Sequence, residues 1–86
     1  MEYVITFNTT NHAIKAEQCL LHQGLRVGVL PLPTQIKAGC GISLRVSPDE
    51  ITQAKEILVI NNINDFGLFM RSMDNGRYLY TDMTKK

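Results

Sequence analysis

The chain has few cysteines, no long apolar run and no CxxC pair among its 86 residues. A membrane-spanning helix needs about 20 consecutive apolar residues, and no stretch of this sequence is long or apolar enough, so we expect no membrane partner. The N-terminal stretch MEYVITF leads directly into a strand pattern without a basic leader region. We therefore expect a cytoplasmic protein whose two cysteines are reduced, and a disulfide framework is disfavoured.

Charge of either sign is also sparse, with nine basic and eight acidic residues and a formal net charge of +1. Nucleic-acid binders neutralise phosphates with clustered basic side chains. The basic residues here are scattered, and only Lys85 and Lys86 adjoin, at a terminus that we expect to fray. The sequence therefore predicts no nucleic-acid partner.

Composition is that of an ordinary globular protein, with 44% hydrophobic and 20% charged residues. A chain of this length is expected to form one domain, which would span residues 1–86. Small domains often gain stability by pairing with a second copy, so a homodimer is a possible assembly.

The apolar patterning predicts five strands and two helices. The expected strands are residues 2–8, 25–30, 42–46, 65–73 and 77–81, and the expected helices run to about residue 23 and from about residue 48 to 61. This order is β-α-β-β-α-β with one additional C-terminal strand. In ferredoxin-like α+β folds, two helices pack on one face of an antiparallel sheet in a split β-α-β arrangement. We expect this fold.

Local signals mark several boundaries in this plan. One of Thr9, Thr10 and Asn11 is expected to cap the first helix, and Gly24 to end it. The segment Ser47–Glu50 predicts a capping box with proline at the first helical position. Asn75 and Gly76 predict a hairpin turn before the last strand.

The first helix predicts a broad apolar arc for packing on the sheet. Its members are Ala13, Ile14, Ala16, Leu20 and Leu21.

Two functions common to this topology fail on their residues, because fold alone fixes no activity. RNA-binding relatives of the topology stack bases on aromatic strand residues, and the strand at 42–46, ISLRV, has none. A copper carrier needs paired thiolates in the first loop, and that loop reads NTTNH.

His12, Cys19 and His22 share a sector of the first helix that could supply zinc ligands, but a packed cysteine and solvated histidines explain these residues better. We therefore expect no metal and no cofactor.

The segment KAGCGI, residues 37–42, contains the most suggestive side chain, Cys40. Gly39 and Gly41 leave both sides of the thiol open and can adopt positive φ. Backbone N–H groups in such a turn, together with Lys37, would favour the nucleophilic thiolate. With no histidine or aspartate adjacent in sequence to act as a base, this thiol suits carrying an atom better than cleaving a bond. The alternative is that Cys40 only fills a gap beside a tight turn.

Two segments, YVITFNTTNHAIKAEQCL and VLPLPTQIKAGCGISLRV, together resemble a family of small bacterial domains described as selenium/sulfur carrier protein-like. The resemblance spans about residues 2 to 70. The basic residue often found after the PxP segment is replaced here by TQI, and the closing hairpin has no counterpart in the family pattern. The matching positions are Tyr3, Phe7, Thr9, Thr10, Ala13, Ala16, Glu17, Gly24, Pro31, Pro33, Cys40, Gly41 and Ile42.

The resemblance implies that Cys40 is a carrier thiol, which holds a persulfide or perselenide and passes it from a donor protein to an acceptor. Such a protein is a carrier rather than an enzyme. The alternative function is a small regulatory or interaction module that dimerises through the strand at 77–81, with Cys40 incidental.

Overall fold

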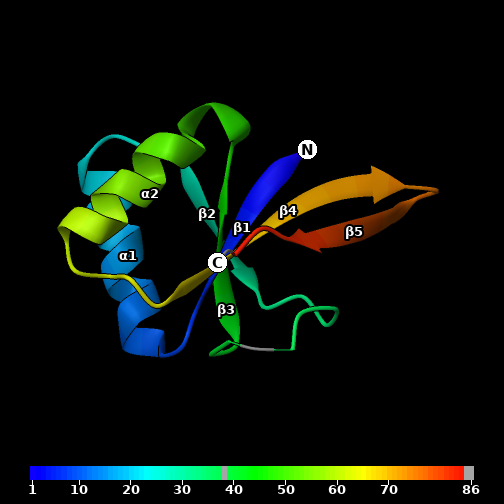
Figure 1. Ribbon diagram of the computed structural model, residues 1–86, viewed down its shortest axis with the longest axis horizontal. Coiled ribbons are helices and arrows are strands. Elements are labelled where there is room, and N and C mark those ends of the chain that lie inside the picture. Colours follow the sequence, from blue (N-terminus) through cyan, green and yellow to red (C-terminus); the bar gives the residue numbers. More distant parts are fainter. Residues whose placement is uncertain (38, 85–86) are drawn as a thin grey trace.

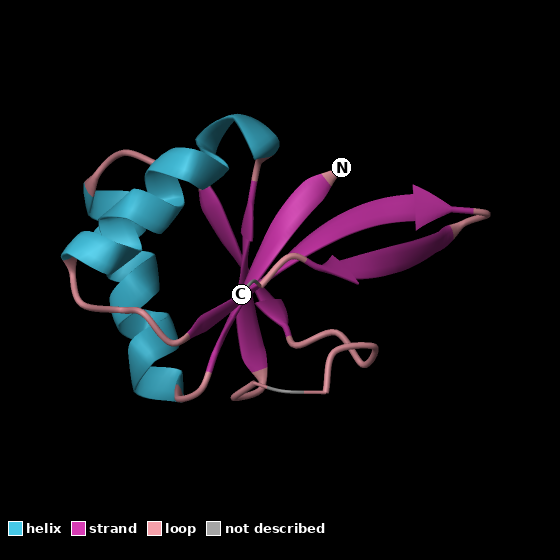
Figure 2. Cartoon of the chain, viewed as in Figure 1, coloured by secondary structure: helices cyan, strands magenta, loops and turns pink. Residues whose placement is uncertain are grey.

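A computed structural model describes residues 1–37 and 39–84 of the chain. Its five antiparallel strands in one sheet and its two helices confirm the α+β class (Figures 1 and 2). Lys85 and Lys86, whose adjacency was noted in the sequence, lie outside the described residues. The elements are β1 (Glu2–Phe7), α1 (Thr10–His22), β2 (Val27–Pro31), β3 (Ile42–Val46), the 3₁₀ helix η1 (Pro48–Glu50), α2 (Ile51–Ile60), β4 (Phe66–Asp74) and β5 (Arg77–Asp82).

The strands lie in the order β2-β3-β1-β4-β5, so β1 is central and β2 and β5 form the two edges. All neighbouring pairs are antiparallel, with Ile5 opposite both Leu44 of β3 and Leu68 of β4. Both helices cover the same face of the sheet, and the segment that follows β2, residues 32–37, lies on the other side (Figure 1). The sheet therefore has one helix-covered face and one helix-free face.

The core lies between the helices and the sheet. Phe7 of β1, Leu20 of α1 and Leu58 of α2 are among its fully buried side chains. The expected alternation along β1 is only partly observed, because Val4 and Thr6 on the opposite face are buried as well. The helix-free face of β1 is therefore also covered at Val4 and Thr6.

The local signals at three boundaries are confirmed. The Thr9 side chain caps α1 by accepting a hydrogen bond from the His12 N–H at 3.1 Å. Gly24 follows the helix with a φ of 86°, a left-handed conformation that glycine adopts without strain. Asn75 and Gly76 both have positive φ, as a two-residue hairpin turn requires.

Two expectations for the helices are wrong. Ile14 and Leu21 are 45% and 48% exposed, so the buried stripe of α1 is narrower than predicted and consists of Ala13, Ala16 and Leu20. The Ser47 side chain makes no capping bond, and the chain forms η1 before α2 begins at Ile51. The Glu50 carboxylate instead accepts a hydrogen bond from the Arg26 backbone N–H at 3.1 Å. The Glu50 carboxylate therefore binds a backbone N–H that is distant in sequence in place of the N–H of Ser47, which the capping box would use.

The boundaries of β2 also differ from the prediction, since it begins at Val27 and includes Pro31. Leu25 is buried before the strand starts. Proline is tolerated at this place because β2 is an edge strand with a neighbour on one side only.

Candidate functional site

Cys40 lies in the loop that joins β2 to β3, immediately before β3 begins. The two ends of this loop are held together by a hydrogen bond from the Leu32 N–H to the Gly41 carbonyl at 2.9 Å. The Ile36 N–H donates to the Pro33 carbonyl at 3.0 Å, which forms a turn within the loop. Rigid stems therefore hold the cysteine close to the sheet. Ala38, which also belongs to the loop, lies outside the described residues.

The two glycines that flank Cys40 both need their lack of a side chain. Gly39 has a φ of 149° and Gly41 a φ of 99°, which L side chains rarely adopt. A Cβ on Gly39 would also meet the Leu32 side chain at 3.0 Å, whereas the space beside Gly41 is open. The backbone on both sides of Cys40 therefore favours glycine, and the space beside Gly41 is open.

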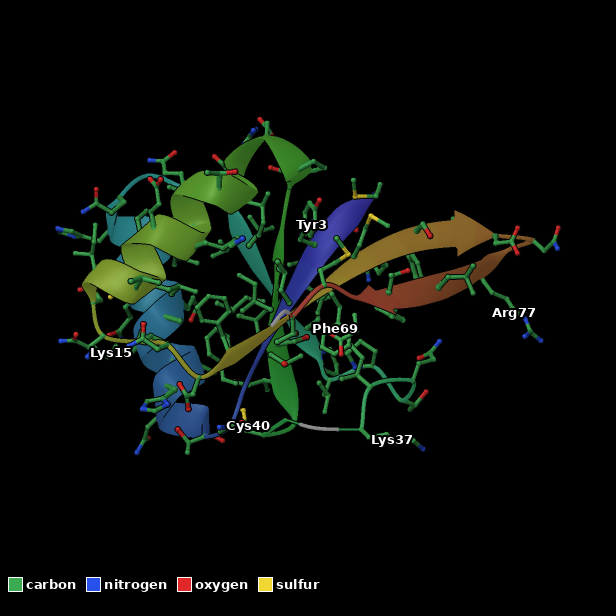
Figure 3. The ribbon with its side chains drawn as sticks, viewed as in Figure 1. Tyr3, Lys15, Lys37, Cys40, Phe69 and Arg77 are labelled. Atoms are coloured by element: carbon green, nitrogen blue, oxygen red, sulfur yellow. The ribbon has the colours of Figure 1, made fainter. Side chains whose placement is uncertain are left out.

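The Cys40 thiol is half-buried and packs against the edge of the hydrophobic core. Its Sγ donates a long hydrogen bond, 3.8 Å, to the backbone carbonyl of Ile42. Figure 3 shows the Lys37 side chain pointing away from Cys40. The loop thus brings Gly39, Cys40 and Gly41 together but leaves the Lys37 ammonium apart from the thiol.

The candidate zinc ligands of α1 do not converge. His12 Nδ1 lies 3.0 Å from the Asp65 carboxylate, which precedes β4, and both side chains are well exposed. Cys19 and His22 line a separate shallow cavity of about 330 Å³. Within residues 1–37 and 39–84, no group of three His, Cys, Asp or Glu residues is placed to hold a metal ion. In the part of the chain that the structure describes, His12, Cys19 and His22 therefore do not form a set of metal ligands.

The helix-free face carries a charged cluster that the sequence analysis missed. Glu2 lies between two arginines, with its carboxylate accepting hydrogen bonds from Arg71 and, at 3.2 Å, from Arg45. The hydrogen bond from Arg71, followed by that from Arg45, holds the pKa of Glu2 below its usual value despite partial burial. Arg71 also stacks over the Tyr78 ring, with its guanidinium carbon 4.2 Å from the ring centre.

The only sequence signal for this cluster was the alternation of β1, which assigns Glu2 to the face opposite Phe7. Arg45 and Arg71 reach Glu2 from positions 43 and 69 residues away. Arg45 is only half exposed and makes an ion pair with Glu2. Gly28 of β2 leaves room for it, because a Cβ there would meet the Arg45 guanidinium at 2.5 Å.

Residues 2–69 match the family model described as "Putative Se/S carrier protein-like". The chain belongs to this family. The match confirms the resemblance seen in the sequence, and it covers every element from β1 to the start of β4, including the Cys40 loop. Searches among curated proteins and among solved structures gave no match.

The match to the Se/S carrier-like family does not include the C-terminal part of the chain. The matched region ends within β4, so the outer half of β4 and all of β5 lie beyond it. Among the described residues, no helix is long and apolar enough to cross a membrane.

Proposed function

We propose that this protein carries sulfur or selenium on Cys40, as a persulfide or perselenide that it receives from a donor protein and gives to an acceptor. The observation that carries the proposal is the geometry of the tip. Cys40 lies between two glycines of positive φ, one of which faces open space, in the segment that the family match includes.

The transfer step is a thiol exchange. The Cys40 thiolate attacks the outer sulfur of a persulfide on the donor, so that a new S–S bond forms on Cys40 and the donor's S–S bond breaks. The donor leaves as a thiolate, and the exchange consumes no oxidant or reductant. Because the attacking species is the thiolate, no substrate pocket or hydrolytic base is required, which is why we propose a carrier rather than an enzyme.

The half-buried position of Cys40 suits a cargo that must be kept and then released. The apolar core edge on one side shields a bound sulfur from water, while the open side beside Gly41 leaves a path for a partner protein. A carrier thiol must be reduced before loading, so we propose that the protein works in the cytoplasm.

We also propose that residues 1–86 form one ferredoxin-like domain. The element order and the strand order β2-β3-β1-β4 support this assignment, with β5 as an addition. A homodimer through β5, raised above as the alternative function, is compatible with the carrier, because β1 and β4 lie between β5 and the strand that follows Cys40.

Sulfur loading tests the proposed function. After incubation with a cysteine desulfurase and cysteine, intact-mass measurement should show one added sulfur atom on the wild-type chain and none on a Cys40→Ser variant. Repeating the reaction with a selenium donor identifies the preferred cargo.

Cys19→Ser is the matched control, because Cys19 is also a reduced, half-buried thiol in this structure. It should load like the wild type. Equal sulfur uptake by wild type and Cys40→Ser would rule out Cys40 as the carrier.

A further inference from the structure

Strand β5 forms an edge of the sheet and, with β4, an arm that extends beyond the rest of it. Pairing of β4 with β1 ends at Arg71, which lies opposite Glu2, whereas pairing of β4 with β5 continues to Asp74 and Arg77. Figure 1 shows this hairpin projecting from the body of the molecule. An exposed edge strand offers its free backbone groups to another strand.

One hydrogen bond determines which β5 residues present those groups. The Met83 N–H donates to the Leu68 carbonyl at 2.7 Å, in the same register that pairs Asp74 with Arg77. Hydrogen-bonded pairs alternate along an antiparallel ladder, so the odd-numbered residues of β5 bond to β4. Tyr78 and Tyr80 therefore turn their N–H and C=O groups to the outer edge.

The side chains of β5 divide between the two faces of the sheet. Tyr78 and Tyr80 lie on the helix-free face, with their ring centres 6.3 Å apart and Arg71 stacked on Tyr78. Leu79 lies on the other face, beyond the helices, and is 48% exposed. The strand thus exposes apolar or aromatic surface on both faces, and Tyr78 is already held in place before any partner arrives.

We infer that two copies of this chain pair antiparallel through β5, with Leu79 on the two-fold axis; the inference gives a register to the homodimer that was raised above as an alternative and does not depend on the carrier function. A two-fold axis normal to the sheet keeps each side chain on its own face, so Leu79 lies opposite Leu79 of the second copy. Tyr78 then lies opposite Tyr80 of the second copy, twice by symmetry. These are the residues with outward backbone groups, and they exchange four hydrogen bonds.

The strand is self-complementary in this register, which is why the occupant is a second copy. Aromatic residues pair on one face and leucines on the other, and both kinds of cross-strand pair are favourable. If the two-fold axis passed through Tyr80 instead, Tyr78 would lie opposite Asp82 and Leu79 opposite Thr81. The Tyr78–Tyr80 and Leu79–Leu79 pairs would then be lost. The other edge, β2, is less suitable, because Gly28 lacks a side chain and Pro31 lacks an N–H.

Sedimentation at increasing protein concentration measures the pairing. The wild type should associate reversibly. Tyr80→Pro should raise the dissociation constant of the dimer about 25-fold, because the dimer loses two backbone N–H donors and each loss weakens association about fivefold. Tyr80→Phe keeps the N–H and the ring and should associate like the wild type. Circular dichroism would verify that each variant is folded.

Cysteine crosslinking then measures the register, in a chain carrying Cys19→Ser and Cys40→Ser. Leu79→Cys should form a disulfide-linked dimer under mild oxidation, because directly opposed residues lie about 4.5–5.5 Å apart. Tyr80→Cys should not, because its two copies would be diagonal neighbours at about 7–8 Å.

The outcomes separate the two levels of the inference. A wild type that stays monomeric, or association that Tyr80→Pro leaves unchanged, would overturn the β5 dimer. Association with efficient crosslinking through Tyr80→Cys in place of Leu79→Cys would overturn the register and leave the dimer standing. Sulfur loading on Cys40 is measured independently of both.

Discussion

Replacing Phe7 with alanine is expected to lower the free energy of unfolding by about 3–5 kcal/mol. Phe7 is the largest of the fully buried side chains, 1% exposed, and lies on the central strand between β3 and β4. Its removal forfeits the transfer of the ring from water and leaves a cavity that the packed core cannot close completely. Since small domains unfold with about 5–15 kcal/mol in total, the variant should lose a large part of its stability.

Urea unfolding followed by circular dichroism measures this loss. Ile60→Ala is the matched control, since Ile60 is a large apolar residue that is 78% exposed at the end of α2. Its effect should stay within about 0.5 kcal/mol. A similar loss of stability in both variants would contradict the core described here.

Replacing Glu2 with glutamine is expected to lower the free energy of unfolding by about 1–2 kcal/mol at neutral pH. The amide keeps the shape of the side chain but removes the charge that pairs with Arg71 and Arg45. The Arg71 side chain is only 11% exposed, so its guanidinium would lose its partner where water compensates poorly.

The effect should depend on pH in a definite direction. Hydrogen bonds from Arg71 and then Arg45 lower the pKa of Glu2 in the folded protein. The stabilisation is therefore complete above the pKa of the unfolded carboxyl group, about 4.3, and disappears as the pH falls through the lower folded value. The wild type and Glu2→Gln should thus differ at pH 7 and converge in acid.

Unfolding curves at pH 7 and at pH 3 or below test this dependence. Glu56→Gln is the control, because Glu56 is an exposed carboxylate on α2. That variant should match the wild type at neutral pH. A difference between wild type and Glu2→Gln that stays constant with pH would show that the charge of Glu2 is not responsible.

The sequence predicted best where neighbouring residues decide the structure. Thr9 caps α1 because its hydroxyl reaches an N–H three residues along the chain. Gly24, Asn75 and Gly76 supply the positive φ that a helix end and a tight hairpin need. The spacing of apolar residues within each segment likewise predicted whether that segment forms a helix or a strand.

Errors appeared where a distant residue competed for the same group. Glu50 has the right spacing for a capping box, yet its carboxylate bonds to the Arg26 N–H, 24 residues away. Ile14 and Leu21 fit an apolar arc by angle, but the sheet covers only part of that arc. Periodicity gives the direction of a side chain, while its burial depends on what packs there.

For the candidate site, the sequence singled out Cys40 and the two glycines, and the family match includes that loop. The sequence could not give the depth of the thiol, which is half-buried against the core, or the direction of Lys37. Both depend on how the loop folds back on the sheet.

The sequence by itself determined the helices, strands and turns, because these depend on backbone preferences and contacts within a few residues. Only the tertiary structure decided that Glu2 joins two arginines, that Tyr78 and Tyr80 turn their backbone groups to the outer edge of β5, and that Cys40 lies beside the core. These features arise when strands remote in sequence become neighbours, and their order and register are set by the packing of the whole sheet.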